Sequence, residues 1–116
     1  GYVAKLTKDD VGDPKIESRI SDTTFSIYFY GCTNNIDCSS IQLSAGYDLD
    51  TPFSTEKTNA WMNQNRYARA FLDEEGDPYL RVDVQMYGDG IGVQSFIETL
   101  DLWRRLVEDF EVVIDW

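Results

Sequence analysis

The segment from Val93 to Phe110 carries the clearest periodicity in the chain and constrains the fold most strongly. Its large apolar residues recur every three or four positions, the spacing of one side of an α-helix; they are Val93, Phe96, Ile97, Leu100, Trp103, Val107 and Phe110. Opposite charges four residues apart, such as Asp101 and Arg105, predict a solvated outer side. A helix with one apolar side has to bury it, so the rest of the chain must supply a surface for it.

Alternation of apolar and polar residues predicts that this surface is a β-sheet. Four alternating runs lie near residues 2–6, 16–20, 25–29 and 41–47, and a further hairpin is predicted over 67–72 and 79–87. Turns rich in Asp, Gly and Pro separate the runs. A chain of 116 residues is the size of one domain with one core. We therefore expect a single α+β domain over residues 1–116, with an antiparallel sheet of about five to six strands and the long C-terminal helix packed on it.

A short helix is predicted between the two groups of strands, from Ser54 to about Gln64. The Ser54 hydroxyl can accept a hydrogen bond from a backbone amide of the first turn. Trp61 is the main apolar residue by which this helix would pack on the sheet. In the C-terminal helix, Ser95 and Glu98 match a capping box, which predicts that the helix begins near Ser95.

Cys32 and Cys38 are six residues apart, between two strand-like runs that a hairpin would bring together. A disulfide is the natural interpretation, and it would indicate an oxidising compartment. A metal site is the rival interpretation, although two cysteines without any histidine supply few zinc ligands. A reduced, packed pair is the third possibility.

The charge of the chain limits its partners. Twenty-one acidic and ten basic residues give a formal net charge of −11. Nucleic acid and anionic membrane surfaces would be repelled by the summed field, so a basic or neutral partner fits better. No apolar run is long enough to insert into a membrane. The chain opens on a strand-like segment, so a signal segment is expected to have been removed.

The residues needed for common catalytic chemistry are missing. Without histidine, Ser-His-Asp and Cys-His mechanisms are not possible. The glycines of residues 88–92 do not follow the spacing of a phosphate-binding loop, and the acidic stretches 9–13 and 73–77 lack the Gly and Glu positions of a calcium-binding loop. These three segments are interpreted as turns. Lysine or a pair of carboxylates could still act, but accidental acid pairs are inevitable among 21 acids. We therefore predict no catalytic residues, no metal site and no cofactor, and expect that the protein is not an enzyme.

Four stretches of the sequence carry a resemblance to a known family. They are Phe29-Tyr30-Gly31-Cys32, residues 57–63, residues 66–78 and Leu102-Trp103. With these motifs in this order, nearly the whole chain resembles the YbjN-domain family. Its members are described as bacterial sensory-transduction regulators of unknown biochemical activity.

The resemblance implies a fold similar to that of type III secretion chaperones, in which a helix usually precedes the first strand. This sequence begins at the strand, so the resemblance implies that one end or face of the sheet is uncovered. The cysteine pair is similar to that of an exported branch of the family. This similarity favours a periplasmic or secreted location.

The chain has more aromatic residues than its expected core needs. Together with the resemblance, this leads us to expect a non-catalytic protein-binding module that is regulatory or chaperone-like. Its partner would be another protein or a second copy of itself. The candidate contact residues lie off the expected core positions, on the short helix or on the outer side of the C-terminal helix; they are Tyr28, Tyr30, Trp61, Tyr67, Phe71 and Leu102. The alternative is a small-molecule or cation binder with an acidic cleft.

Overall fold

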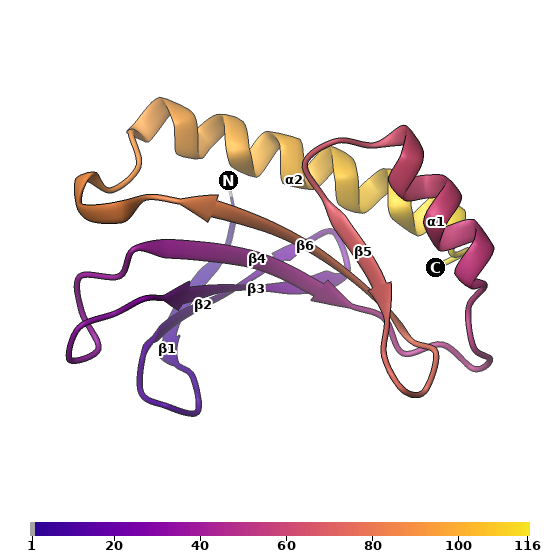
Figure 1. Cartoon of the computed structure of the whole chain (residues 1–116), viewed down its shortest axis with the longest axis horizontal. Helices are drawn as coiled ribbons and strands as arrows, with labels where there is room; N and C mark the ends of the chain where they lie inside the picture. Colours follow the sequence, from indigo (N-terminus) through magenta and orange to yellow (C-terminus); the bar gives the residue numbers. More distant parts are fainter. Residues whose placement is uncertain (1) are drawn as a thin grey trace.

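The computed structural model describes residues 2–116 and forms one six-stranded antiparallel sheet with both α-helices on the same face (Figure 1). The strands lie in the order β1-β2-β3-β4-β6-β5. Their bounds are Ala4–Lys8 (β1), Pro14–Ile20 (β2), Thr23–Tyr30 (β3), Ser40–Gly46 (β4), Arg69–Leu72 (β5) and Pro78–Gln85 (β6). The predicted α+β fold with a meander of four strands is confirmed.

The two acidic stretches are turns that satisfy their own backbone. Asp9 Oδ1 accepts hydrogen bonds from the amides of Val11 at 3.0 Å and Asp13 at 2.9 Å. Asp73 Oδ1 does the same for Glu75 at 2.9 Å and Asp77 at 3.0 Å. An Asp side chain that bonds to the backbone two residues on favours a tight reversal. The interpretation of both stretches as turns is therefore confirmed.

The short helix α1 (Thr55–Gln64) begins where the sequence predicts. Ser54 is its N-cap, and the Ser54 hydroxyl accepts a hydrogen bond from the Lys57 amide at 3.1 Å. The C-terminal helix α2 (Val93–Val113) has Gly92 as its N-cap, without a capping side chain. The capping-box prediction is wrong, because Ser95 lies inside the first turn. A 3-10 turn, η1 (Tyr87–Asp89), joins β6 to the loop before α2.

The core lies between the sheet and the two helices. Phe110 of α2 is fully buried, and its ring centroid is 5.0 Å from that of Trp61 in α1 and 5.9 Å from that of Tyr47, which follows β4. Phe25 of β3 packs on Trp103 of α2 with ring centroids 5.8 Å apart. The C-terminal half of α2 is thereby held on the sheet, with α1 beside it (Figure 1).

Cys32 and Cys38 form a disulfide in the loop between β3 and β4, with an S–S distance of 2.07 Å. Inside this loop, Thr33 and Ile36 exchange backbone hydrogen bonds of 2.7 and 3.0 Å around Asn34 and Asn35, both of which have positive φ. Such a turn suits the twist of a hairpin. The disulfide closes a short loop, which contributes about 2.4 kcal/mol in the chain-entropy model.

Candidate functional site

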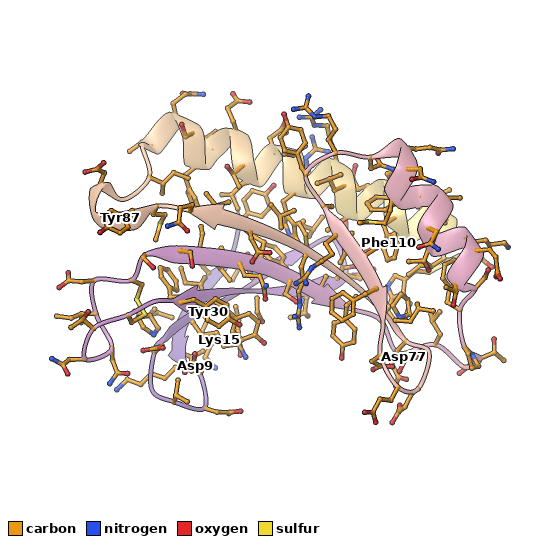
Figure 2. All side chains as sticks on the ribbon, viewed as in Figure 1. Asp9, Lys15, Tyr30, Asp77, Tyr87 and Phe110 are labelled. Atoms are coloured by element: carbon orange, nitrogen blue, oxygen red, sulfur yellow. A yellow bond between two sulfur atoms is a disulfide. The ribbon has the colours of Figure 1, made fainter. Side chains whose placement is uncertain are left out.

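Half of the side chains of each strand point away from the helices and form what we call the open face of the sheet. Figure 2 shows Lys15 and Tyr30 on this side, whereas Phe110 lies between the sheet and the helices. Residues directly opposite each other on neighbouring strands share a face. By this register, the open face consists of Lys5, Thr7, Lys15, Glu17, Arg19, Thr24, Ser26, Tyr28, Tyr30, Ser40, Gln42, Ser44, Gly46, Arg69, Phe71, Tyr79, Arg81, Asp83 and Gln85.

The open face carries charge of the opposite sign to the molecule as a whole. Five of the ten basic residues lie on it, but only two of the twenty-one acidic ones, so its formal charge is 5 − 2 = +3 in a chain of −11. The acidic residues are Glu17 and Asp83. The summed charge of the sequence therefore does not describe the surface that a ligand would meet here.

Three of the predicted contact residues lie on the open face, in two aromatic clusters. Tyr28 and Tyr30 of β3 stack with ring centroids 6.3 Å apart, and Lys15 Nζ lies 5.1 Å from the centroid of Tyr28. Phe71 of β5 stacks on Tyr79 of β6 with centroids 5.5 Å apart. Both clusters combine exposed ring surface with basic side chains, a combination that suits apolar and anionic groups together.

Gly46 determines where the ring of Tyr79 lies. The two residues are directly opposite each other on β4 and β6, and a Cβ atom on Gly46 would come within 2.5 Å of Tyr79 Cε2. Because glycine has no side chain, the ring can lie flat over β4. Tyr79 is thereby held beside Phe71.

Two arginines complete the cluster around Phe71. Arg69 and Arg81 are directly opposite each other on β5 and β6, and their guanidinium carbons lie 5.3 and 5.0 Å from the centroid of Phe71. Arg81 Nε donates a hydrogen bond to Ser44 Oγ at 3.0 Å. The sequence analysis did not predict this pair. Its signal was that Arg69 and Phe71, and likewise Tyr79 and Arg81, are two residues apart in a strand and therefore share a face.

The other predicted contact residues are not on the open face. Tyr67 and Leu102 line a shallow hollow of about 530 Å³ between the segment after α1 and the outer side of α2. Tyr67 is exposed, with the guanidinium of Arg66 4.8 Å from its ring centroid, whereas Leu102 is half-buried. Trp61 belongs to the core: it is 3% exposed, and its Nε1 donates to Asp109 Oδ2 at 2.8 Å. It offers no surface to a partner.

On the helix side of the sheet, an apolar groove of about 310 Å³ lies under the start of α2. We call it the apolar groove, and it is lined by Ile16, Ile27, Phe29, Ile41, Met86, Ile91, Val93, Phe96 and Ile97. It lies at the N-terminal half of α2, whereas α1 lies beside the C-terminal half (Figure 1). Ile97 is 51% exposed, and Leu6, which pairs with Ile16 on the same face, is 73% exposed. Part of this face is thus exposed in the described residues.

Tyr47, which lies near the C-terminal end of α2, has the largest pKa shift among the described residues. Burial raises the pKa of the Tyr47 hydroxyl, and its hydrogen bond to Glu111 Oε2 at 2.9 Å raises it further. The same Glu111 oxygen accepts a hydrogen bond from the Thr23 hydroxyl at 2.6 Å. This triad joins β3, α2 and the end of β4.

On the exposed side of α2, a hydrogen bond from Arg104 at 2.8 Å lowers the pKa of Asp101. Arg105 Nε lies 3.3 Å from Asp101, and Arg104 also pairs with Glu108 at 3.1 Å. The outer side of α2 is therefore a row of solvated ion pairs, which confirms the prediction from the charge spacing.

Among residues 2–116, no group of three or more His, Cys, Asp or Glu side chains is placed to hold a metal ion. Neither helix is long and apolar enough to cross a membrane.

The fold and these surfaces define a small α+β domain with an open aromatic face on one side of its sheet and an apolar groove on the other. The chain belongs to the YbjN family: the family model, described as "putative bacterial sensory transduction regulator", matches residues 1–116. Comparison with curated proteins and with solved structures gave no match. The similarity to type III secretion chaperones stays a prediction.

Proposed function

We propose that this member of the YbjN family is a non-catalytic protein-binding module, regulatory or chaperone-like, and that the apolar groove takes the apolar side of a helix from a partner protein. The groove supports this proposal most directly, because all nine of its lining residues are apolar and several remain open to water. Exposed apolar surface of this kind is typical of interaction sites. An amphipathic helix would fill it in the manner of other helix-in-groove complexes.

The charge of the chain favours one kind of helix for this groove. With a formal net charge of −11, the protein attracts a partner whose polar side is basic. Apolar contact would supply most of the affinity, and the basic residues would speed the encounter. We therefore expect the bound segment to be an amphipathic helix rich in Lys or Arg.

Replacing Ile97 with glutamate is expected to weaken the binding of a fluorescein-labelled amphipathic helical peptide of leucine and lysine roughly tenfold or more, because the change places a charge in the apolar groove. Fluorescence anisotropy measures this affinity. The matched control is Val112→Glu, which adds the same charge at an 80% exposed position of the same helix. It should bind like the wild type, and equal weakening by both variants would contradict the proposal.

A second copy of the chain is the other occupant that the groove can accept. Sedimentation velocity of the same three proteins distinguishes the two. A wild-type dimer that Ile97→Glu dissociates and Val112→Glu leaves intact would assign the groove to self-association. A monomer that binds the peptide would assign it to a separate partner.

We also propose that the protein works in the periplasm or outside the cell. The Cys32–Cys38 disulfide supports this location, because such bonds persist in oxidising compartments and are rare in the cytosol. Alkylation of intact producing cells with a thiol reagent, followed by mass spectrometry, should find both cysteines unmodified. Alkylation of both before lysis and reduction would argue for a reducing compartment.

A further inference from the structure

Arg69 and Arg81 place two positive charges against each other in a protein that has an excess of acids. They are directly opposite on β5 and β6, the arrangement in which like charges destabilise a sheet. Among residues 2–116, neither guanidinium has a carboxylate within ion-pair distance. The two adjacent positive charges are thus not neutralised by a carboxylate of the described residues.

The two acids of the open face are bound to other groups, and only Asp83 lies near the arginine pair. Glu17 pairs with Lys15 at 3.7 Å. Asp83 Oδ1, two residues along β6 from Arg81, accepts a hydrogen bond from Gln42 Nε2 at 2.9 Å. Asp83, the acid closest to Arg81 along β6, is therefore bound to Gln42. The arginine pair remains available to an external anion.

The surroundings of Arg81 orient its guanidinium group, whereas Arg69 is exposed and contacts the ring of Phe71. Arg81 is held by the Ser44 hydroxyl through Nε, and no hydrogen bond among the described residues uses its terminal nitrogens. Both guanidinium groups lie close to the ring of Phe71, which in turn stacks on Tyr79. A guanidinium with free terminal N–H groups binds a carboxylate in a bidentate fashion, and ordering it beforehand reduces the entropy lost on binding.

We propose that the arginine pair of the open face is a docking site for an acidic segment of a partner protein. Carboxylates of that segment bind Arg69 and Arg81, and its apolar side chains pack on Phe71 and Tyr79. Charge complementarity carries this assignment, since Arg69 and Arg81 lie directly opposite each other and, among the described residues, have no carboxylate within ion-pair distance. The site is separate from the apolar groove, on the other side of the sheet.

The distribution of charge favours a short acidic segment over nucleic acid. At physiological ionic strength, charges more than about 8 Å away are largely screened, so a short segment responds mainly to the nearby arginines. A nucleic acid strand has a charge on every nucleotide and extends beyond the patch. It would then meet the acidic turn at residues 73–77, which follows β5 directly.

The test uses a fluorescein-labelled peptide of alternating glutamate and valine, titrated with the intact protein at low and physiological salt. The double variant R69Q/R81Q should bind it roughly tenfold or more weakly, because two charge-assisted contacts are lost. The control is Arg66→Gln, which removes an exposed arginine beside Tyr67, away from the open face. It should bind like the wild type.

Urea unfolding of the same variants separates binding from folding. R69Q/R81Q relieves the repulsion between two like charges but also loses the Arg81–Ser44 hydrogen bond and the contacts with Phe71, so it should keep a cooperative urea transition and be fully folded in the binding assay. Stable folding with lost peptide binding supports the docking site. A folded double variant that binds the peptide like the wild type would overturn the proposal.

Two further probes test the class of anion. A labelled single-stranded oligothymidine that binds more tightly than the acidic peptide would overturn the proposal in favour of nucleic acid. Inorganic phosphate that displaces the peptide at micromolar concentration would likewise show a phosphate site. Equal affinity of the glutamate peptide and its glutamine counterpart would also overturn the proposal, since the carboxylates would then contribute nothing.

Discussion

Replacing Phe110 with alanine is expected to lower the free energy of unfolding by about 3–5 kcal/mol, the usual cost of deleting a fully buried phenylalanine. Phe110 is 0% exposed and packs on both Trp61 and Tyr47. Its ring therefore joins α1, α2 and the end of β4. The cavity left by the substitution would lie where three elements meet, which limits how far any one of them can move in to fill it.

Urea unfolding followed by tryptophan fluorescence measures the effect of Phe110→Ala, since Trp61 reports on the same contact. Val112→Ala is the matched control on the same helix, and its exposed side chain should change stability by less than about 0.5 kcal/mol. If Phe110→Ala cost no more than this control, the described packing of α2 on α1 would be wrong.

The stability of the domain should fall at alkaline pH because of Tyr47. Its folded-state pKa is raised above the ordinary value of 10.0, so the folded protein keeps this proton at a pH where the unfolded chain loses it. The stabilisation is complete below pH 10 and is lost as the pH rises from there toward the folded-state pKa. Each pH unit in this range costs about 1.4 kcal/mol.

Tyr47→Phe provides the matched variant for this prediction. At pH 9 it should be less stable than the wild type by about 1 kcal/mol, because the hydrogen bond to Glu111 is lost. At pH 11 the gap should close, since phenylalanine has no proton to lose. Urea unfolding at both pH values measures the gap, and a gap that stays constant would show that Tyr47 does not titrate as described.

Sequence reasoning predicted the fold well where local patterns determine it. The alternation around Phe25, Ile27 and Phe29 and the helical spacing up to Phe110 directly predict which side of each element is buried. The Ser54 cap and the two Asp turns depend only on residues a few positions apart. The Ser54 cap, the Asp turns and the burial of the C-terminal half of the helical stripe are confirmed, whereas Val93 and Ile97 at its start are 79% and 51% exposed.

The same reasoning failed where contacts come from distant parts of the chain. Trp61 was predicted both to pack on the sheet and to contact a partner; the second prediction is wrong, because Asp109 and Phe110, 48 and 49 residues further along, contact it. The juxtaposition of Arg69 and Arg81 depends on the exact register of β5 on β6. A turn one residue longer would have placed other side chains opposite each other.

The open face is a positively charged area bordered by acidic turns, because most of the acids outside it lie in the loops that join the strands and helices. The remaining part of the chain holds five basic and nineteen acidic residues, so that +3 on one side of the sheet faces −14 elsewhere. An anionic partner would therefore be attracted only at short range to the open face, and a basic partner to the loops around it. Both attractions would weaken as salt screens the field.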